Sequence, residues 1–210
     1  CLMRPVEIQK PRFEFRSFGK DFSLQAKKMK RLSEPITKNM RIRRSKEVYI
    51  ISITNDINNT KIRDNKIDVK RLVQIKDGLE QWNPVTKTEF PVLKEYLLDQ
   101  FFPSLYTISP PLYNNIYSVS DFIKIINDHE DLYAIRVSKE RFGYIVNQTI
   151  CEVANVTINN TRVVTISSES IDSAAVKKTL IDIGLESVEN INYLQAIKRV
   201  SGIINKPLAN

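Results

Sequence analysis

Polar and apolar residues alternate over many stretches of this chain, and a period of two is typical of β-strands. The first stretch is 6–18, in which PRFEFRSF separates charged residues by single aromatic ones and Pro11 suits an edge or a bulge. Turn-forming residues separate it from further predicted strands at 46–53, 60–64, 66–75 and 79–90. Strand and turn at this spacing predict an antiparallel meander.

The middle and the end of the chain show helical spacing instead. Helices are predicted at 91–102, with Pro91 in the first turn, and at 118–130, with Ser120 as N-cap. Strands resume at 131–139, 141–147, 149–158 and 161–169. Two last helices are predicted at 170–184, ending at Gly184, and at 189–202. The order predicts an α+β chain, interpreted as one domain over 1–210 with central helices at about 91–130.

The segment 20–46 is polar and basic and carries two clusters, KKMKR and RIRRSK. A short helix is predicted at 24–32, followed by a basic loop. Two interpretations stay open for these clusters, because a solvated mobile loop and a nucleic-acid-binding patch have the same composition.

Composition is that of a soluble globular protein, with 42% hydrophobic and 27% charged residues in 210 positions. The apolar runs are too short to span a bilayer, no signal-peptide pattern opens the sequence, and the start at Cys1 suggests a trimmed or fragmentary N-terminus. Cys1 and Cys151 make no disulfide framework. A cytoplasmic location is therefore expected.

The charge balance adds an expectation about partners. Thirty-two Lys and Arg against twenty-four Asp and Glu give +8, which favours nucleotides, polyphosphate, nucleic acid or acidic lipid. The sequence lacks the common motifs of P-loop NTPases, dehydrogenases, zincins and serine hydrolases. With five glycines in the chain, a bound phosphate would have to be held by side chains. The single His129 is interpreted as a surface residue.

Charges gather on particular faces of the predicted strands. Lys61 and Arg63 share one face, as do Lys139 and Arg141, and Glu152 lies between apolar neighbours. In an ordinary sandwich these would be the solvent side. In a closed barrel they would converge on a channel, where only a multiply charged anion or its metal would compensate them. In that case Glu14, Glu152 and Glu169 suit Mg²⁺ or Mn²⁺.

The order of these strands resembles the CYTH superfamily, the triphosphate tunnel enzymes, over roughly residues 6–200. The family's opening E-x-E-x-K strand is similar to Arg12-Phe13-Glu14-Phe15-Arg16, with Arg12 in place of the first carboxylate. Its later cation and carboxylate strands are similar to the stretches that hold Lys61, Arg63, Lys70, Lys139, Arg141, Glu152 and Glu169, with Ser167 in place of one carboxylate. Residues 76–91 fit no general pattern of the family and look like the mark of a subgroup of bacterial proteins.

The resemblance implies an eight-stranded antiparallel tunnel-like β-barrel flanked by helices. It implies that the phosphates are bound by Arg12, Arg16, Lys61, Arg63, Lys70, Lys139 and Arg141. It also implies that Glu14, Glu152 and Glu169 hold one or two metal ions, Mg²⁺ or Mn²⁺, with Glu152 and Glu169 as catalytic residues. Family members hydrolyse a triphosphate, and some cyclise ATP. The carboxylates missing at 12 and 167 predict weaker metal binding.

Three functional hypotheses follow. The first is a metal-dependent phosphohydrolase acting on triphosphate or a nucleoside triphosphate. The second is a binding module that holds the same small polyanion without hydrolysis. The third, less favoured, is nucleic-acid binding through the two basic clusters. No membrane partner is expected.

Overall fold

Eight strands close into an antiparallel barrel in this computed structural model, which describes residues 10–210. The order around the barrel is β1-β10-β9-β8-β2-β3-β4-β5, and pairing of β1 with β5 closes it. The strands are β1 (Phe13–Gly19), β2 (Ile42–Ser52), β3 (Asn58–Arg63), β4 (Lys66–Lys76), β5 (Leu79–Glu89), β8 (Leu132–Val146), β9 (Thr149–Ile158) and β10 (Thr161–Ser170). The predicted fold class, an eight-stranded antiparallel barrel flanked by helices, is confirmed.

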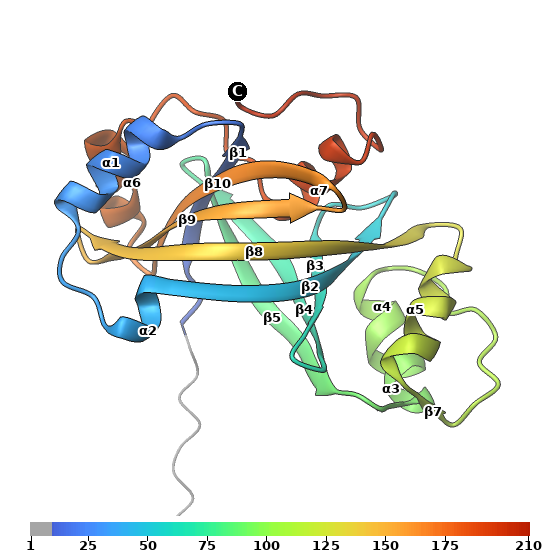
Figure 1. The fold of residues 1–210 in the computed structure, drawn as a ribbon. Coiled ribbons are helices and arrows are strands. Elements are labelled where there is room, and N and C mark those ends of the chain that lie inside the picture. Colours follow the sequence, from blue (N-terminus) through green and yellow to red (C-terminus); the bar gives the residue numbers. More distant parts are fainter. Residues whose placement is uncertain (1–9) are drawn as a thin grey trace, which may run out of the picture.

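Helices pack against the outside of the barrel at two places (Figure 1). At one, α1 (Ser23–Leu32) lies beside α6 (Ser173–Ile183), with the short α2 (Lys38–Arg41) below them. At the other are α3 (Lys94–Tyr96), the π-helical turn η1 (Leu97–Phe101), α4 (Phe102–Ser104) and α5 (Val119–Asn127), with the small sheet of β6 (Val92–Leu93) and β7 (Ile116–Tyr117). None of the helices in the described part of the chain is long and apolar enough to cross a bilayer.

Local signals explain where the longer helices begin and end. The hydroxyl of Ser118 accepts a hydrogen bond from the Asp121 amide, and the Asp121 carboxylate accepts one from the Ser118 amide, so the capping box of α5 starts at Ser118 and the predicted cap at Ser120 is wrong. The α6 helix begins after Asp172 and ends at Gly184, whose φ of 80° suits glycine.

The last helix, α7 (Tyr193–Val200), divides the inside of the barrel from solvent at one end. Its Tyr193, Leu194 and Ile197 are buried against interior side chains of the strands, among them Tyr49 and Val156. This apolar cluster fills one end of the barrel, so the polar interior-facing residues are confined to the other end.

Three predicted elements differ from the structure. The basic run at 42–46 is the first half of β2 and not a loop, because it pairs with β8 from Ile42 onward. The strands predicted at 131–139 and 141–147 are one continuous strand, β8. The first strand begins at Phe13, after Pro11, and the part predicted at 6–9 lies outside the described residues.

The first central helix also starts later than predicted. Val92 and Leu93 pair with β7, so the chain is extended after Pro91 and turns helical only at Lys94.

Candidate functional site

Interior-facing charged residues surround a cavity of about 270 Å³ inside the open end of the barrel. Alternation places every second residue of each strand on this face. Among the described residues, seven cationic side chains line the cavity: Arg16, Arg43, Lys61, Arg63, Lys70, Lys139 and Arg141. The carboxylates that line it are Glu14, Asp68, Glu152 and Glu169. The charged strand faces therefore meet in one chamber, as the closed-barrel interpretation requires.

Arg12 is the exception among the predicted phosphate ligands. It lies before β1, its side chain is 43% exposed, and it does not line the cavity. Its Nη1 donates to Glu169 Oε1 at 3.1 Å. Placing Arg12 in the tunnel was wrong, because the alternating strand that would have aimed it inward begins one residue later. The six other predicted cations all face the cavity, and their roles as phosphate ligands stay predictions.

Glu152 lies at the centre of an arginine cluster. Its Oε2 is 3.2 Å from Arg141 Nε and 3.5 Å from an Arg43 nitrogen, and its Oε1 is 3.6 Å from Arg16 Nη1. Burial alone would raise the pKa of Glu152, but Arg16 and Arg141 reverse this and hold the pKa below its usual range. Glu152 is therefore an ionised counter-charge that aligns three guanidinium groups around the cavity.

A second cluster forms around Glu47, deeper in the barrel. The Glu47 carboxylate pairs with Lys139 Nζ, and its Oε1 is 3.3 Å from Arg63 Nη1 and 3.9 Å from Lys61 Nζ. Lys139 also donates to the Tyr49 hydroxyl at 2.8 Å and lies 3.9 Å from the centroid of the Tyr193 ring. Both charged partners of this pair are almost fully buried, at 3% exposure for Glu47 and 4% for Lys139.

Burial also changes the titration of the deep lysines. It lowers the pKa of Lys61 to about 8, although the Glu47 carboxylate opposes the shift. For Lys139, burial and repulsion from Lys61 lower the pKa well below the usual value, again against the attraction of Glu47. These lysines are therefore the cations of the chamber that are least strongly protonated.

Three glutamates lie in a row across three neighbouring strands. Glu14 on β1 is directly opposite Glu169 on β10 and opposite Glu80 on β5. Burial, together with repulsion from Glu14, raises the pKa of Glu169 and that of Glu80, although Asn192 Nδ2 donates to Glu80 at 2.9 Å. Arg12, paired with Glu169, and Arg16, paired with Glu14, oppose part of this repulsion.

The predicted three-glutamate metal site is not formed. Within residues 10–210 no group of three or more His, Cys, Asp or Glu side chains is arranged to hold a metal ion. The reason is that the arginines hold Glu152 apart from the other two carboxylates. The remaining two carboxylates each have an arginine partner: Arg16 Nε is 2.6 Å from Glu14 Oε1, and Arg12 Nη1 is 3.1 Å from Glu169 Oε1. Two carboxylates suffice in number for Mg²⁺, which takes its other oxygens from water and substrate phosphates.

The sequence reasoning missed Arg43, which lines the chamber, and Glu47 and Glu80, which contact residues of its lining. Arg43, Glu47 and Tyr49 share one parity in the run RIRRSKEVYI, so the alternation that predicted a strand from 46 onward also extends back to 43. The basic composition of 41–46 concealed it. For Glu80 the signal was the strand predicted at 79–90, which no family pattern placed in the barrel.

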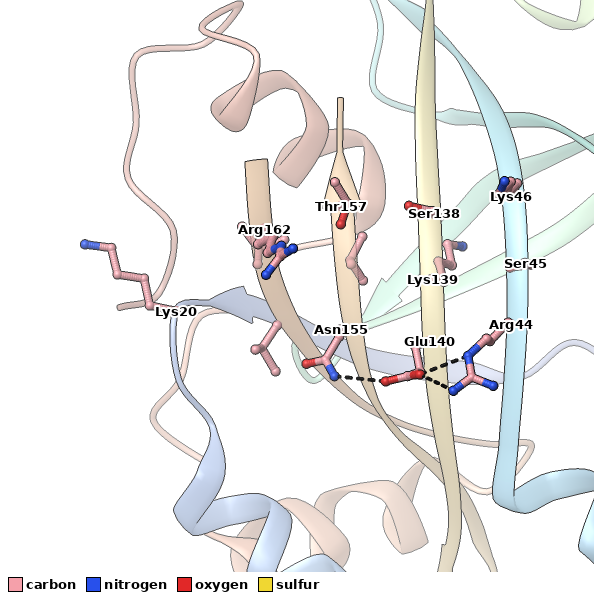
Figure 2. Close-up of a pocket in the computed structure, with 13 residues that line it drawn as sticks. Lys20, Arg44, Ser45, Lys46, Ser138, Lys139, Glu140, Asn155, Thr157 and Arg162 are labelled. Atoms are coloured by element: carbon pink, nitrogen blue, oxygen red, sulfur yellow. Dashed lines mark hydrogen bonds and ion pairs between the residues drawn. The ribbon is translucent and has the colours of Figure 1, made fainter. Parts of the chain in front are cut away.

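A second, larger hollow crosses the outside of the barrel over β2, β8, β9 and β10, with a volume of about 840 Å³. Figure 2 shows Arg44, Glu140 and Asn155 joined across its floor, with Arg44 Nη2 donating to Glu140 Oε2 at 2.6 Å. Lys20, Lys46 and Arg162 add charge to its rim, and no aromatic side chain of the described chain lines it. Without aromatic stacking platforms this groove offers single-stranded nucleic acid little beyond charge. The smaller inner cavity is therefore the better candidate site.

Comparison with known proteins supports the fold. Neither a protein-family model nor a curated protein matches the sequence. A conserved hypothetical protein from Pyrococcus furiosus superimposes with a TM-score of 0.50 and 16% identity, over 87% of this chain and 98% of its own. A provisionally assigned adenylate cyclase from Bacillus halodurans gives a TM-score of 0.50 and 11% identity, over 90% of this chain and 98% of its own.

A third structure is more distant. It is a Hippeastrum protein for which a dominant triphosphatase activity is described, at a TM-score of 0.45 and 10% identity over 91% of this chain and 96% of its own. At these identities the likeness is one of fold. The likeness to the first two structures agrees with the closed antiparallel barrel described above.

Proposed function

We propose that this chain binds a small inorganic polyphosphate-type anion, such as diphosphate or triphosphate, inside its barrel. One observation carries the proposal: among the described residues, seven cationic side chains on five strands line a single chamber. Cations this close repel one another, and the internal carboxylates compensate them only in part. A compact anion supplies the missing negative charge, whereas an apolar ligand would not.

The size of the chamber supports an inorganic guest. Pockets for organic ligands of drug size usually have volumes of about 300 to 1,000 Å³. The chamber, at about 270 Å³, lies just below that range and is lined mainly by charged groups. It suits a short phosphate chain, and the nucleoside of a nucleoside triphosphate would project from the open end.

The arginine cluster provides the binding chemistry. Each guanidinium has five N–H donors in a planar fork, so Arg16, Arg43 and Arg141 can keep their contacts with Glu152 and still donate to phosphate oxygens. Lys70 lines the same chamber, and no carboxylate of the described residues forms a salt bridge with it. We assign Lys70 and the three arginines to the first contacts with the guest.

Hydrolysis is the second candidate function, and the Glu14–Glu169 pair favours it. These two carboxylates would hold Mg²⁺ or Mn²⁺, which when bound polarises a phosphoryl oxygen. Glu169 would accept or donate a proton at its carboxylate, since burial and repulsion from Glu14 raise its pKa toward a range useful for acid–base work. Glu152, held by its arginines, would orient the phosphate ligands and not the metal.

Calorimetric titration and a phosphate-release assay together test both functions. Binding of diphosphate or triphosphate by the wild-type chain, lost in Arg141→Gln, is the expected result. No binding of either anion would refute the proposal. Phosphate release from triphosphate or ATP with Mg²⁺ or Mn²⁺, and none from Glu169→Gln, would show hydrolysis. Binding without release by the wild-type chain would identify a non-catalytic module.

A further inference from the structure

In the deep cluster around Glu47, the N–H donors of the central cation are all paired within the protein, unlike those of the arginine cluster. The Lys139 ammonium has three N–H donors and faces three partners: the Glu47 carboxylate, the Tyr49 hydroxyl and the face of the Tyr193 ring. No donor of Lys139 is left for a guest. Glu47 in turn is shared by Lys139, Arg63 and Lys61.

Glu47 and Lys139 are the most deeply buried charged pair at the chamber. Their side chains are 0% and 1% exposed, whereas those of Lys61 and Arg63 are 15% and 32% exposed and those of Arg16, Arg43 and Arg141 are 13%, 46% and 16% exposed. Tyr49 and Tyr193 belong to the apolar cluster that α7 closes, with ring centroids 5.3 Å apart. The Glu47 carboxylate therefore lies behind Lys139, Lys61 and Arg63, next to the end of the cavity that Tyr49 and Tyr193 line.

We propose that Glu47 is a built-in counter-anion that limits the length of the guest. Its carboxylate compensates three cations that would otherwise bind an inner phosphoryl group of a longer chain. In the absence of metal, a third phosphoryl group then adds little to the affinity of the chamber for an anion. This inference rests on the proposed anion-binding function and assigns its specificity to one residue.

The arginine cluster shows why the effect belongs to Glu47 and not to every internal carboxylate. Glu152 also contacts three cations, but they are arginines, which have more donors than one carboxylate can accept. Removing Glu152 frees no new layer of cations, because those arginines already face the guest. Removing Glu47 frees a donor of Lys139 and takes the shared counter-charge from Lys61 and Arg63, which already line the chamber.

The test is the ratio of affinities across chain lengths. Dissociation constants for phosphate, diphosphate and triphosphate are measured by calorimetry in EDTA for the wild type, Glu47→Gln and Glu140→Gln. The control residue Glu140 pairs with Arg44 on the outer face, so the control also removes one carboxylate and leaves the chamber unchanged. We expect the wild type and the control to bind triphosphate no more than about threefold tighter than diphosphate. In Glu47→Gln we expect this ratio to rise at least tenfold.

A merely structural role for Glu47 would lower all affinities together and leave the ratio unchanged, and that result would overturn the inference. A wild type that already prefers triphosphate by tenfold or more would also overturn it. If the wild type binds none of the three anions, the proposed function fails. In that case tight triphosphate binding by Glu47→Gln alone would still support the role of Glu47, and no binding by that variant would refute it.

Glu47→Gln leaves the buried Lys139 and the partly buried Lys61 and Arg63 without the carboxylate that they share, so the folding of this variant needs a second measurement. If the variant does not fold alone, refolding is followed by circular dichroism with phosphate or triphosphate present. We expect triphosphate to restore the fold at a lower concentration than phosphate, because it supplies the missing negative charge at depth. Equal effects of the two anions, or no effect of either, would contradict the proposal.

Discussion

At the scale of single residues, the cations of the chamber have different tasks that the sequence alone does not separate. Lys139 and Lys70 are both interior lysines on strands, yet one is saturated by Glu47 and Tyr49 while the other forms no salt bridge with any described carboxylate. Lysine is a strongly hydrated point charge, so its role is set by the partners that replace water. The exposure of each lysine, and the number of groups it already pairs with, therefore decide which cations can bind an anion in the chamber.

Lys70→Met should weaken diphosphate binding about tenfold, because a cation that faces the cavity contributes roughly 1.4 kcal/mol to binding a phosphate. The free energy of unfolding of Lys70→Met should stay within about 0.5 kcal/mol of the wild-type value, because the substitution removes an exposed side chain that forms no ion pair with a described carboxylate. Lys46→Met, on the outer groove, is the matched control and should bind normally. Calorimetry on both variants gives the comparison. Equal losses in the two would mean that the outer groove and not the chamber binds the anion.

The second prediction at this scale concerns pH. Burial lowers the pKa of Lys61 to about 8, so the free protein loses this charge as pH rises through that value. A bound anion favours the charged form and raises the pKa of Lys61, so affinity is highest below pH 8 and falls as pH rises above it. Titrations with diphosphate from about pH 7 to 9 should show that the association constant falls as pH rises. Near the upper end of this range, the fall should approach tenfold per pH unit.

Lys61→Arg separates this effect from titration of the ligand itself, because the guanidinium stays charged over the whole range. Its affinity profile should be flatter than that of the wild type. Two profiles with the same slope would assign the pH dependence to diphosphate and exclude Lys61.

At the scale of elements, α7 determines that the barrel is a chamber with one closed end. Lys198 of this helix is buried and donates to Asp56 and to the Asn55 carbonyl, which fixes α7 to the turn after β2. Asn192 caps the helix by accepting from the Gln195 amide while its own amide donates to Glu80 in the barrel. The helix is thus connected to the chamber that it closes.

Ile197→Ala should lower the free energy of unfolding by about 2 to 5 kcal/mol, the usual cost of a buried large-to-small change with its cavity. Ile197 is fully buried against the strands. Ile181→Ala, at a position of α6 that is 59% exposed, should cost less than about 1 kcal/mol. Urea unfolding measures both. A small effect at Ile197 would show that α7 does not seal the barrel in solution.

Alternation alone predicted most of the elements that build the chamber, and it did so where charges and β-branched residues alternate cleanly. Lys61 and Arg63 on β3, Lys139 and Arg141 on β8, and Glu152 on β9 all face inward as their parity predicts. It failed in β2, because the charge-rich run that holds Arg43 resembles a solvated loop until a partner strand is known. Pairing with β8 is a long-range property, and no local pattern encodes it.

The sequence also could not show which carboxylates stand together. Glu14, Glu152 and Glu169 were expected to share a metal, but that depends on where the arginines of other strands lie. Register places Glu14 opposite Glu169, while Arg16, Arg43 and Arg141 converge on Glu152. These are distances between elements far apart in the chain, and they follow from closure of the barrel.

At the scale of the whole molecule, the excess of eight positive charges is not concentrated inside the barrel. In the described residues, seven interior cations face the four cavity carboxylates, and Glu47 and Glu80 bring the acids to six. The interior therefore has a formal charge of about +1, and the rest of the excess lies on the outer surface, in α1 and along the outer groove. Such a small positive excess balances an anion of low charge, or a polyphosphate whose charge is partly neutralised by a bound metal ion.

This balance yields a prediction about metal. Triphosphate alone would leave the interior strongly negative, so it should raise the melting temperature of the wild type only slightly in EDTA. With Mg²⁺ or Mn²⁺ present, part of that charge is neutralised and Glu14 and Glu169 gain a cation, so stabilisation by triphosphate should rise by several degrees. Thermal unfolding with the metal alone, triphosphate alone and both together measures the coupling between them. Glu169→Gln should reduce this coupling, because it removes one of these two carboxylates. Stabilisation by triphosphate that is equal with and without metal would contradict the charge argument and favour a metal-independent binding module.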